Sequence, residues 1–218
     1  MLASIVDLLL PPACALCHVR MPDASTLFCD SCAGSMSSCP PPPCHGCDIP
    51  PSFESARAPF LYLGLVRQAV LAFKYQGRRR IGAWLAEAMG RLAQRNLPID
   101  SIDAVAPVPM HWLKARLRGH SAAAQLARDV ARHLGRPYHP DVLARARWTS
   151  TQTRLTTRQR LRNVEGAFRA RLPRGAHPRV LLIDDVLTTG ATADACARAL
   201  RAAGAPSVWV LTAACAPA

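Results

Sequence analysis

Two adjacent acids and a run of small and hydroxyl residues lie together in the segment 180–192, which reads VLLIDDVLTTGAT. An apolar run typical of a buried strand leads into Asp184 and Asp185. Carboxylates can bind the two hydroxyls of a ribose, either directly or through Mg²⁺. The loop that follows contains Thr188, Thr189, Gly190, Ala191 and Thr192. A helix is predicted to begin there, and its N-terminus suits a phosphate. The pattern therefore predicts a site for a 5-phosphoribosyl group.

Other phosphate sites fit this segment less well. The chain has neither G-x-x-x-x-G-K-[ST] nor G-x-G-x-x-G. Paired acids at a strand end also occur in Mg²⁺-dependent phosphotransfer domains, but those do not need the Thr-Thr-Gly-Ala-Thr run. A plain strand–turn–helix with solvated acids is the remaining alternative. The run closely resembles the phosphoribosyl pyrophosphate (PRPP) signature of type I phosphoribosyltransferases. This resemblance implies a PRPP site with Mg²⁺, with Asp184 and Asp185 as its catalytic acids.

A basic loop follows a second predicted strand. The segment 105–109, VAPVP, runs from apolar residues into a proline-rich turn, and Lys114, Arg116 and Arg118 come next. If the two strands are neighbours, this loop lies across the same cleft. Because pyrophosphate carries several negative charges, its partners should be cations or backbone amides. We therefore expect these three cations to bind PRPP, and a solvated basic loop is the alternative.

Cysteines dominate the first part of the chain. Seven of the nine lie within residues 14–47, and the pairs Cys14/Cys17 and Cys29/Cys32 form two C-x-x-C knuckles separated by 11 residues. Two such knuckles suit a tetrahedral zinc site with four thiolates. A metal of this kind can fold a small segment that lacks a core of its own. A redox role is less favoured, because no thioredoxin-like pattern surrounds the pairs.

A second metal site is an open question. Cys39, Cys44 and Cys47 supply three of the four ligands that zinc prefers, and His45 or His18 can supply the fourth. Loss of the second site and cross-pairing of the knuckles are the alternatives. The two remaining cysteines, Cys196 and Cys215, are expected to be ordinary packing residues.

Alternating apolar strands and helices must position these groups. We expect strands at 59–63, 102–107, 179–183 and 208–213, and helices at 65–75, 81–94, 121–134 and 192–203. This order predicts an α/β fold, with a parallel sheet covered by helices on both faces. We divide the chain into a Cys-rich zinc-binding segment, 1–52, and a phosphoribosyltransferase-like domain, 53–218.

The charge balance is strongly basic, with 27 Lys+Arg against 14 Asp+Glu, a net charge of +13. Only Lys74 and Lys114 are lysines. Arginine suits phosphate groups, so phosphorylated ligands or nucleic acid are the expected partners, and coding bias is the alternative. No run approaches the roughly 20 apolar residues of a membrane span, and 1–10 is a poor signal peptide. We expect a cytoplasmic protein without membrane insertion.

Several short motifs resemble the ComF (competence protein F) family in the same order. Phe73-Lys74-Tyr75 with Gly77 is similar to its F-K-Y-x-G, and 107–119 is similar to its P-x-P…R-G segment. The cysteine pairs match as well. Its R-x-T-x-T-Q…L…R…R-N…A-F segment is matched by Arg147, Thr149, Thr151, Gln152, Leu155, Arg158, Arg162, Asn163, Ala167 and Phe168. The chain departs from the family's R-G-F-N-Q, because it reads RGHSA at 118–122.

The resemblance implies a part in DNA uptake for natural transformation, with single-stranded DNA and other DNA-uptake proteins as partners. The polar segment 145–168 carries Arg154, Arg158, Arg160 and Arg162, and it is either a mobile element that closes over the ligand or a solvated basic helix. Two functions stay open. One is an active phosphoribosyltransferase that acts on a small acceptor, and the other is an accessory protein that binds PRPP or single-stranded DNA.

Overall fold

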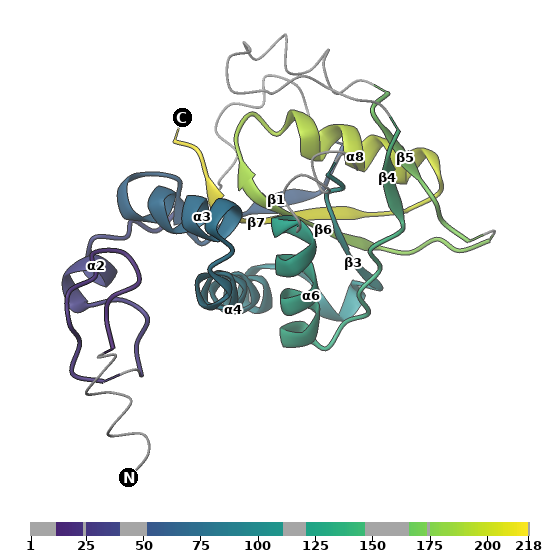
Figure 1. The fold of residues 1–218 in the computed structure, drawn as a ribbon. Coiled ribbons are helices and arrows are strands. Elements are labelled where there is room, and N and C mark those ends of the chain that lie inside the picture. Colours follow the sequence, from purple (N-terminus) through teal and green to yellow (C-terminus); the bar gives the residue numbers. More distant parts are fainter. Residues whose placement is uncertain are drawn as a thin grey trace.

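A parallel five-stranded sheet forms the centre of the molecule (Figure 1). The computed structural model describes residues 12–23, 25–39, 52–110, 121–146, 166–173 and 175–217. The strands are β1 (Ser55–Arg57), β2 (Phe60–Leu61), β3 (Ala104–Pro107), β6 (Val180–Leu187) and β7 (Val208–Cys215). They follow the order β1-β7-β6-β3, and β2 also pairs with β7. All these pairings are parallel, as expected for apolar strands connected through helices.

Helices cover both faces of the sheet, so the predicted α/β class is confirmed (Figure 1). One face packs against α3 (Gly64–Gln76), α4 (Arg79–Asn96) and α6 (Ala122–Leu134), and the other packs against α8 (Ala191–Ala202). A two-stranded antiparallel ribbon, β4 (Leu143–Arg145) with β5 (Phe168–Ala170), lies on the α8 side. The short elements α2 (Asp30–Gly34) and η1 (Ile99–Ser101) complete the described structure.

The strand β6 shows how the sequence builds the two layers. Its side chains alternate, so Leu181 and Ile183 join the core below α3, α4 and α6. Val180 and Leu182 join the core against α8. All four side chains are fully buried. A continuous apolar run is therefore required here, because both faces of the strand are covered.

Local signals set both ends of α6. Ser121 caps α6, because its hydroxyl accepts a hydrogen bond from the backbone N–H of Ala124 at 3.3 Å. Gly135 ends the same helix with a φ of 62°, a left-handed conformation that favours glycine. Two expectations needed adjustment. Of the strand predicted at 59–63, only β2 (Phe60–Leu61) is formed, and β1 lies before the predicted range. The strand β6 continues four residues beyond the predicted end at 183.

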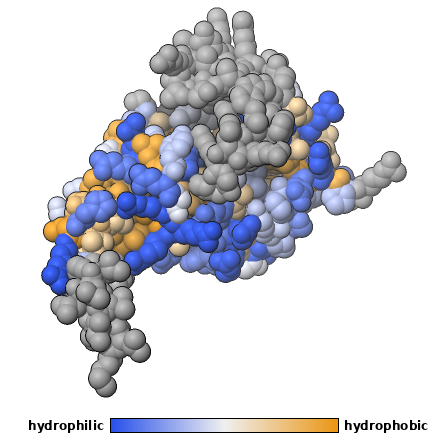
Figure 2. Space-filling model, in the orientation of Figure 1, coloured by the Kyte–Doolittle hydropathy of each residue, from blue (hydrophilic) through white to orange (hydrophobic). Residues whose placement is uncertain are grey.

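The N-terminal segment packs against the main body. Phe28 meets Trp84 of α4 edge to face at 4.9 Å, and Arg78 donates to the carbonyl of Ala15 at 2.8 Å. In Figure 1 this segment lies beside α3 and α4. On the face shown in Figure 2, the described residues are mainly hydrophilic, with apolar areas on the side of α3. Within the described residues, no helix has the length and apolar character needed to cross a membrane.

Candidate functional site

The two acids lie where β6 passes beyond the end of its neighbour β3. The register of these strands ends at the pair Pro107 and Ile183, while β6 and β7 remain paired to Leu187 and Cys215. The prediction that the strand ends at the acids is therefore wrong. Because β7 extends as far as β6, it keeps β6 in extended conformation past Asp184 and Asp185. Ligands of parallel α/β sheets bind at this carboxyl edge.

Asp185 points to the face that carries α3, and there it meets Lys74. The ammonium Nζ lies 2.5 Å from Oδ2 of Asp185, with the side chains of Lys74 and Asp185 only 25% and 12% exposed. Burial alone would lower the pKa of Lys74, but the charges of Asp185 and Asp184 outweigh it and raise that pKa. Lys74 therefore keeps its positive charge beside Asp185. Lys74 belongs to the F-K-Y-x-G motif of the sequence, but that motif alone does not connect it with the acids.

Asp184 points to the opposite face, toward α8 and β4. Its Oδ1 accepts a hydrogen bond from the backbone N–H of Asp185 at 2.8 Å. Burial and the negative charge of Asp185 raise the pKa of Asp184 to about 7, although Lys74 and Arg145 act in the other direction. Arg145 extends over the ring of Phe168, 5.3 Å from its centroid. Asp184 is thus the acid whose charge the protein compensates less, which suits a carboxylate that meets a ligand.

This electrostatic cost predicts a pH-dependent effect of Asp184→Asn. The folded pKa of about 7 lies above the ordinary value of 3.8, so ionisation of Asp184 destabilises the fold as pH rises between these values. The variant has no such cost. Urea unfolding without ligand should show the variant more stable than the natural chain, by up to about 4 kcal/mol at pH 8 and by less than half of that at pH 5. The exposed Asp100→Asn is the control for the loss of a surface carboxylate. If Asp184→Asn changes the stability equally at pH 5 and pH 8, the assignment is contradicted.

The loop after β6 leads directly into α8. Gly190 is the N-cap of this helix and has a φ of 74°, which strongly favours glycine at this position. The first helical hydrogen bond runs from the N–H of Asp194 to the carbonyl of Gly190 at 2.8 Å. Thr188 is exposed, whereas Gly190 and Ala191 are buried. The helix N-terminus and its dipole therefore face the loop that follows the two acids.

Several predicted site residues lie outside the described structure. These are Lys114, Arg116 and Arg118 of the basic loop, Cys44 and Cys47, and the arginines Arg154, Arg158, Arg160 and Arg162. The strand that leads into the basic loop is described. Val108 donates its N–H to the carbonyl of Ile183 at 2.8 Å, so this chain segment passes beside the start of the acid pair. Sequence reasoning did not place Lys74 and Arg145 in the site, since neither lies near the acids along the chain.

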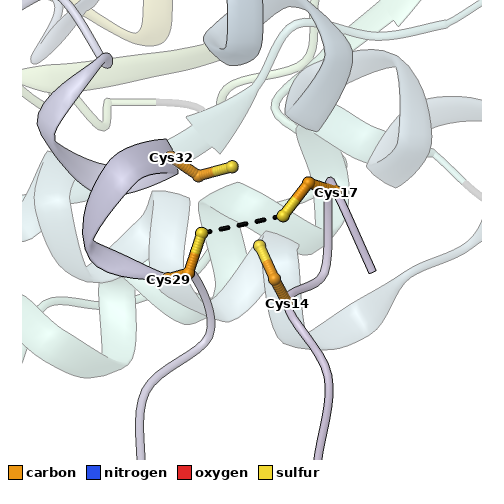
Figure 3. Close-up of side chains that lie close together, drawn as sticks. All are labelled: Cys14, Cys17, Cys29 and Cys32. Carbon is orange, nitrogen blue, oxygen red and sulfur yellow. Dashed lines mark hydrogen bonds between the residues drawn. The ribbon is translucent and has the colours of Figure 1, made fainter. Parts of the chain in front are cut away.

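The four cysteines of the two knuckles gather into one cluster, in which their sulfurs point toward one another (Figure 3). All four Sγ atoms lie within 4.8 Å of one another, and those of Cys17 and Cys29 are 3.6 Å apart. Four sulfurs at about 2.3 Å from a tetrahedral zinc would be about 3.8 Å apart. The cluster can therefore hold a metal such as zinc.

The surroundings of the cluster act in opposite directions on the pKa values of Cys14 and Cys32. Burial opposes charge on Cys14, but hydrogen bonds from the backbone of Cys17, Cys29 and Leu16 outweigh it and lower the pKa of Cys14 to about 6. Burial and the neighbouring thiols raise the pKa of Cys32 to about 12. A doubly charged cation would remove this conflict, because it stabilises all four thiolates together.

Cys39 has a different partner from the one predicted. It forms a disulfide with Cys215, which corrects the prediction of Cys39 as a ligand of a second zinc and that of Cys215 as an ordinary packing residue. The contact arises because Cys39 donates its N–H to the carbonyl of Pro59, next to β2, while β2 pairs with the end of β7. Sequence spacing could not show this, since 176 residues separate the two cysteines. Cys196 is buried within α8, as expected for a packing residue.

Two solved structures resemble the chain at the level of fold. One is the glutamine PRPP amidotransferase of B. subtilis complexed with ADP and GMP, with a TM-score of 0.44, 21% identity and 65% of this chain covered. The other, described as the allosteric regulatory enzyme of purine biosynthesis, also has a TM-score of 0.44, with 22% identity. The chain spans 30% of the length of each of these proteins.

Sequence comparison identifies relatives over most of the chain, although no protein-family model matches it. DNA utilization protein YhgH of Salmonella typhimurium is 29% identical over 93% of this chain and 96% of its own length. YhgH of Escherichia coli K12 is 30% identical over 77% of this chain and 75% of its own. Competence protein F of Haemophilus influenzae is 29% identical over 63% of this chain and 62% of its own. The chain therefore belongs to the family of YhgH and competence protein F.

Proposed function

We propose that this protein binds PRPP together with Mg²⁺ at the acid pair and the loop 188–192, and that it takes part in the handling of incoming DNA. One observation carries the proposal. The strand β6 presents Asp184 and Asp185 at the carboxyl edge of the sheet, and the same chain then turns through Gly190 into the N-terminus of α8. The two carboxylates, which can accept hydrogen bonds from the ribose hydroxyls, thus lie only a few residues before the helix N-terminus that can bind a phosphate.

In the proposed complex, the 5-phosphate lies at the N-terminus of α8 and the ribose hydroxyls face the acids. The left-handed Gly190 lets the backbone approach the phosphate closely. Asp184 accepts from the hydroxyls or holds the metal, because oxygen ligands suit Mg²⁺. The metal would supply positive charge that neutralises the diphosphate as it leaves. The proposed site also includes Asp185 and the loop residues Thr188, Thr189, Ala191 and Thr192. The cations of the basic loop complete it: Lys114, Arg116 and Arg118.

The direct test is a calorimetric titration of the full chain with PRPP. We expect binding with Mg²⁺ in excess and a large loss of affinity when EDTA removes the metal. ADP provides a control, because it carries a diphosphate at C5 rather than at C1 and lacks the arrangement that the site is proposed to recognise. Equal binding of ADP and PRPP would contradict the assignment, and so would the absence of PRPP binding.

The names of the relatives support a role with DNA. The net charge of +13 fits a partner with a phosphate backbone, and we place the protein with the DNA-uptake machinery in the cytoplasm. Residues 1–52 are proposed as the zinc-binding segment and 53–218 as the phosphoribosyltransferase-like domain. Transfer of the phosphoribosyl group to a small acceptor is the second candidate, favoured by the same acid pair.

One assay separates these two roles. Polarisation of labelled single-stranded DNA should show binding that weakens steeply with salt, because bound phosphates release counterions. Arg158→Ala combined with Arg160→Ala and Arg162→Ala should lower the affinity and flatten the salt slope. If no binding occurs at low salt, the DNA role is wrong. Release of pyrophosphate from PRPP in the presence of a small acceptor would then favour the transferase.

A further inference from the structure

We propose that Lys74 binds the diphosphate of PRPP, from the face of the sheet opposite to the helix that receives the 5-phosphate. This inference rests on the proposed function of the same site. It assigns a binding role to a residue of α3, an element that lies far from the acids and the phosphate loop along the chain.

Packing fixes the position of Lys74. The preceding residue, Phe73, is fully buried, and its ring lies against Gly82 of α4. A Cβ atom on Gly82 would lie 2.4 Å from this ring, so only glycine lets the two helices approach so closely. The last turn of α3 is thereby held against the sheet. From there Lys74 reaches Asp185 at 2.5 Å, with a quarter of its side chain still exposed.

The two faces of β6 give the ligand a direction. Asp184, Arg145 and α8 lie on one face, whereas Asp185 and Lys74 lie on the other. PRPP carries its phosphate on C5 and its diphosphate on C1, at opposite ends of the ribose. With the 5-phosphate at the N-terminus of α8 and the diol at the acids, C1 points away from α8. The diphosphate then extends toward the face where Lys74 is placed.

An ammonium group can serve Asp185 and a diphosphate at the same time. It has three N–H donors, and one carboxylate oxygen takes one of them. A lysine at this position is also notable in composition, because the chain has 25 arginines and only two lysines, from 27 Lys+Arg in all. A compact point charge can turn between two anions, whereas the planar fork of arginine favours a single carboxylate. Asp185 thus holds the ammonium group of Lys74 beside the proposed diphosphate site before PRPP binds.

Lys74→Met tests the proposal through selectivity between two ligands. We expect the variant to bind PRPP with Mg²⁺ about tenfold to a hundredfold more weakly, the loss typical of a charge-assisted hydrogen bond. Its affinity for ribose 5-phosphate, which lacks the diphosphate, should change about twofold at most. Arg91→Met is the matched control, because Arg91 pairs with Glu87 on the exposed side of α4. It should leave both affinities unchanged.

An equal loss for both ligands would overturn the proposal, because Lys74 would then act only by holding Asp185. Unchanged PRPP affinity would overturn it too. If the natural chain binds neither ligand, the proposed function itself fails, and the role of Lys74 falls with it.

Amine labelling of the natural protein gives a second measurement that does not depend on a variant. With only two lysines in the chain, mass spectrometry can follow the Lys74 peptide alone. PRPP with Mg²⁺ should slow the acetylation of Lys74 several-fold, and ribose 5-phosphate should not. Equal labelling rates with the two ligands would overturn the proposal.

Discussion

Asp184→Asn combined with Asp185→Asn should abolish the Mg²⁺-dependent binding of PRPP. The double change keeps the size of both side chains but removes two negative charges from the carboxyl edge of the sheet. Each carboxylate that binds a hydroxyl or a metal contributes a charge-assisted interaction, so the expected loss is on the order of a hundredfold or more. Calorimetry with PRPP and excess Mg²⁺ measures it directly.

Two controls make this result specific. Asp100→Asn combined with Asp129→Asn removes the same number of charges from residues that pair with Arg136 and Arg132, and it should leave PRPP affinity unchanged. Circular dichroism should show that both double variants remain folded. PRPP affinity equal to that of the natural chain in the Asp184/Asp185 variant would refute the ribose-binding assignment.

Removal of metal from the Cys14/Cys17/Cys29/Cys32 cluster should unfold the N-terminal segment. The four sulfurs gather within 4.8 Å of one another, and without a cation their thiolates would repel. We expect about one zinc per purified chain and a loss of structure in the segment when a strong chelator is added. Since Phe28 packs on Trp84 at 4.9 Å, this unfolding should expose the indole and shift its fluorescence to longer wavelength.

Cysteine variants show whether the shift comes from the metal site. Cys14→Ser combined with Cys32→Ser should give metal-free protein whose fluorescence already resembles that of the chelated form. Cys196→Ala, which changes a buried cysteine of α8, should retain zinc. A Trp84→Phe chain should lose most of the fluorescence response. Metal-free protein with an intact N-terminal segment would contradict the assignment of zinc.

Local patterns predicted most of the fold because the elements here have strong local causes. The apolar run that becomes β6 is buried on both faces, so its composition alone indicated a covered parallel strand. Ser121 and Gly135 marked the ends of α6 for the same kind of reason, since capping is decided within one turn. The end of β6 could not be predicted, because its length depends on pairing with β7 up to Cys215.

Of the candidate site, the sequence by itself determined the groups that lie close along the chain. These are the acid pair, the loop through Gly190, and the two cysteine knuckles, whose four sulfurs the structure brings together. Only the tertiary structure decided that Lys74 pairs with Asp185 and that Cys39 meets Cys215. It also decided that Asp184 and Asp185 face opposite layers. The contacts of Lys74 and Cys39 join residues that are far apart in the sequence. They form only once the helices and the N-terminal segment have packed against the sheet, and local sequence patterns do not determine that packing.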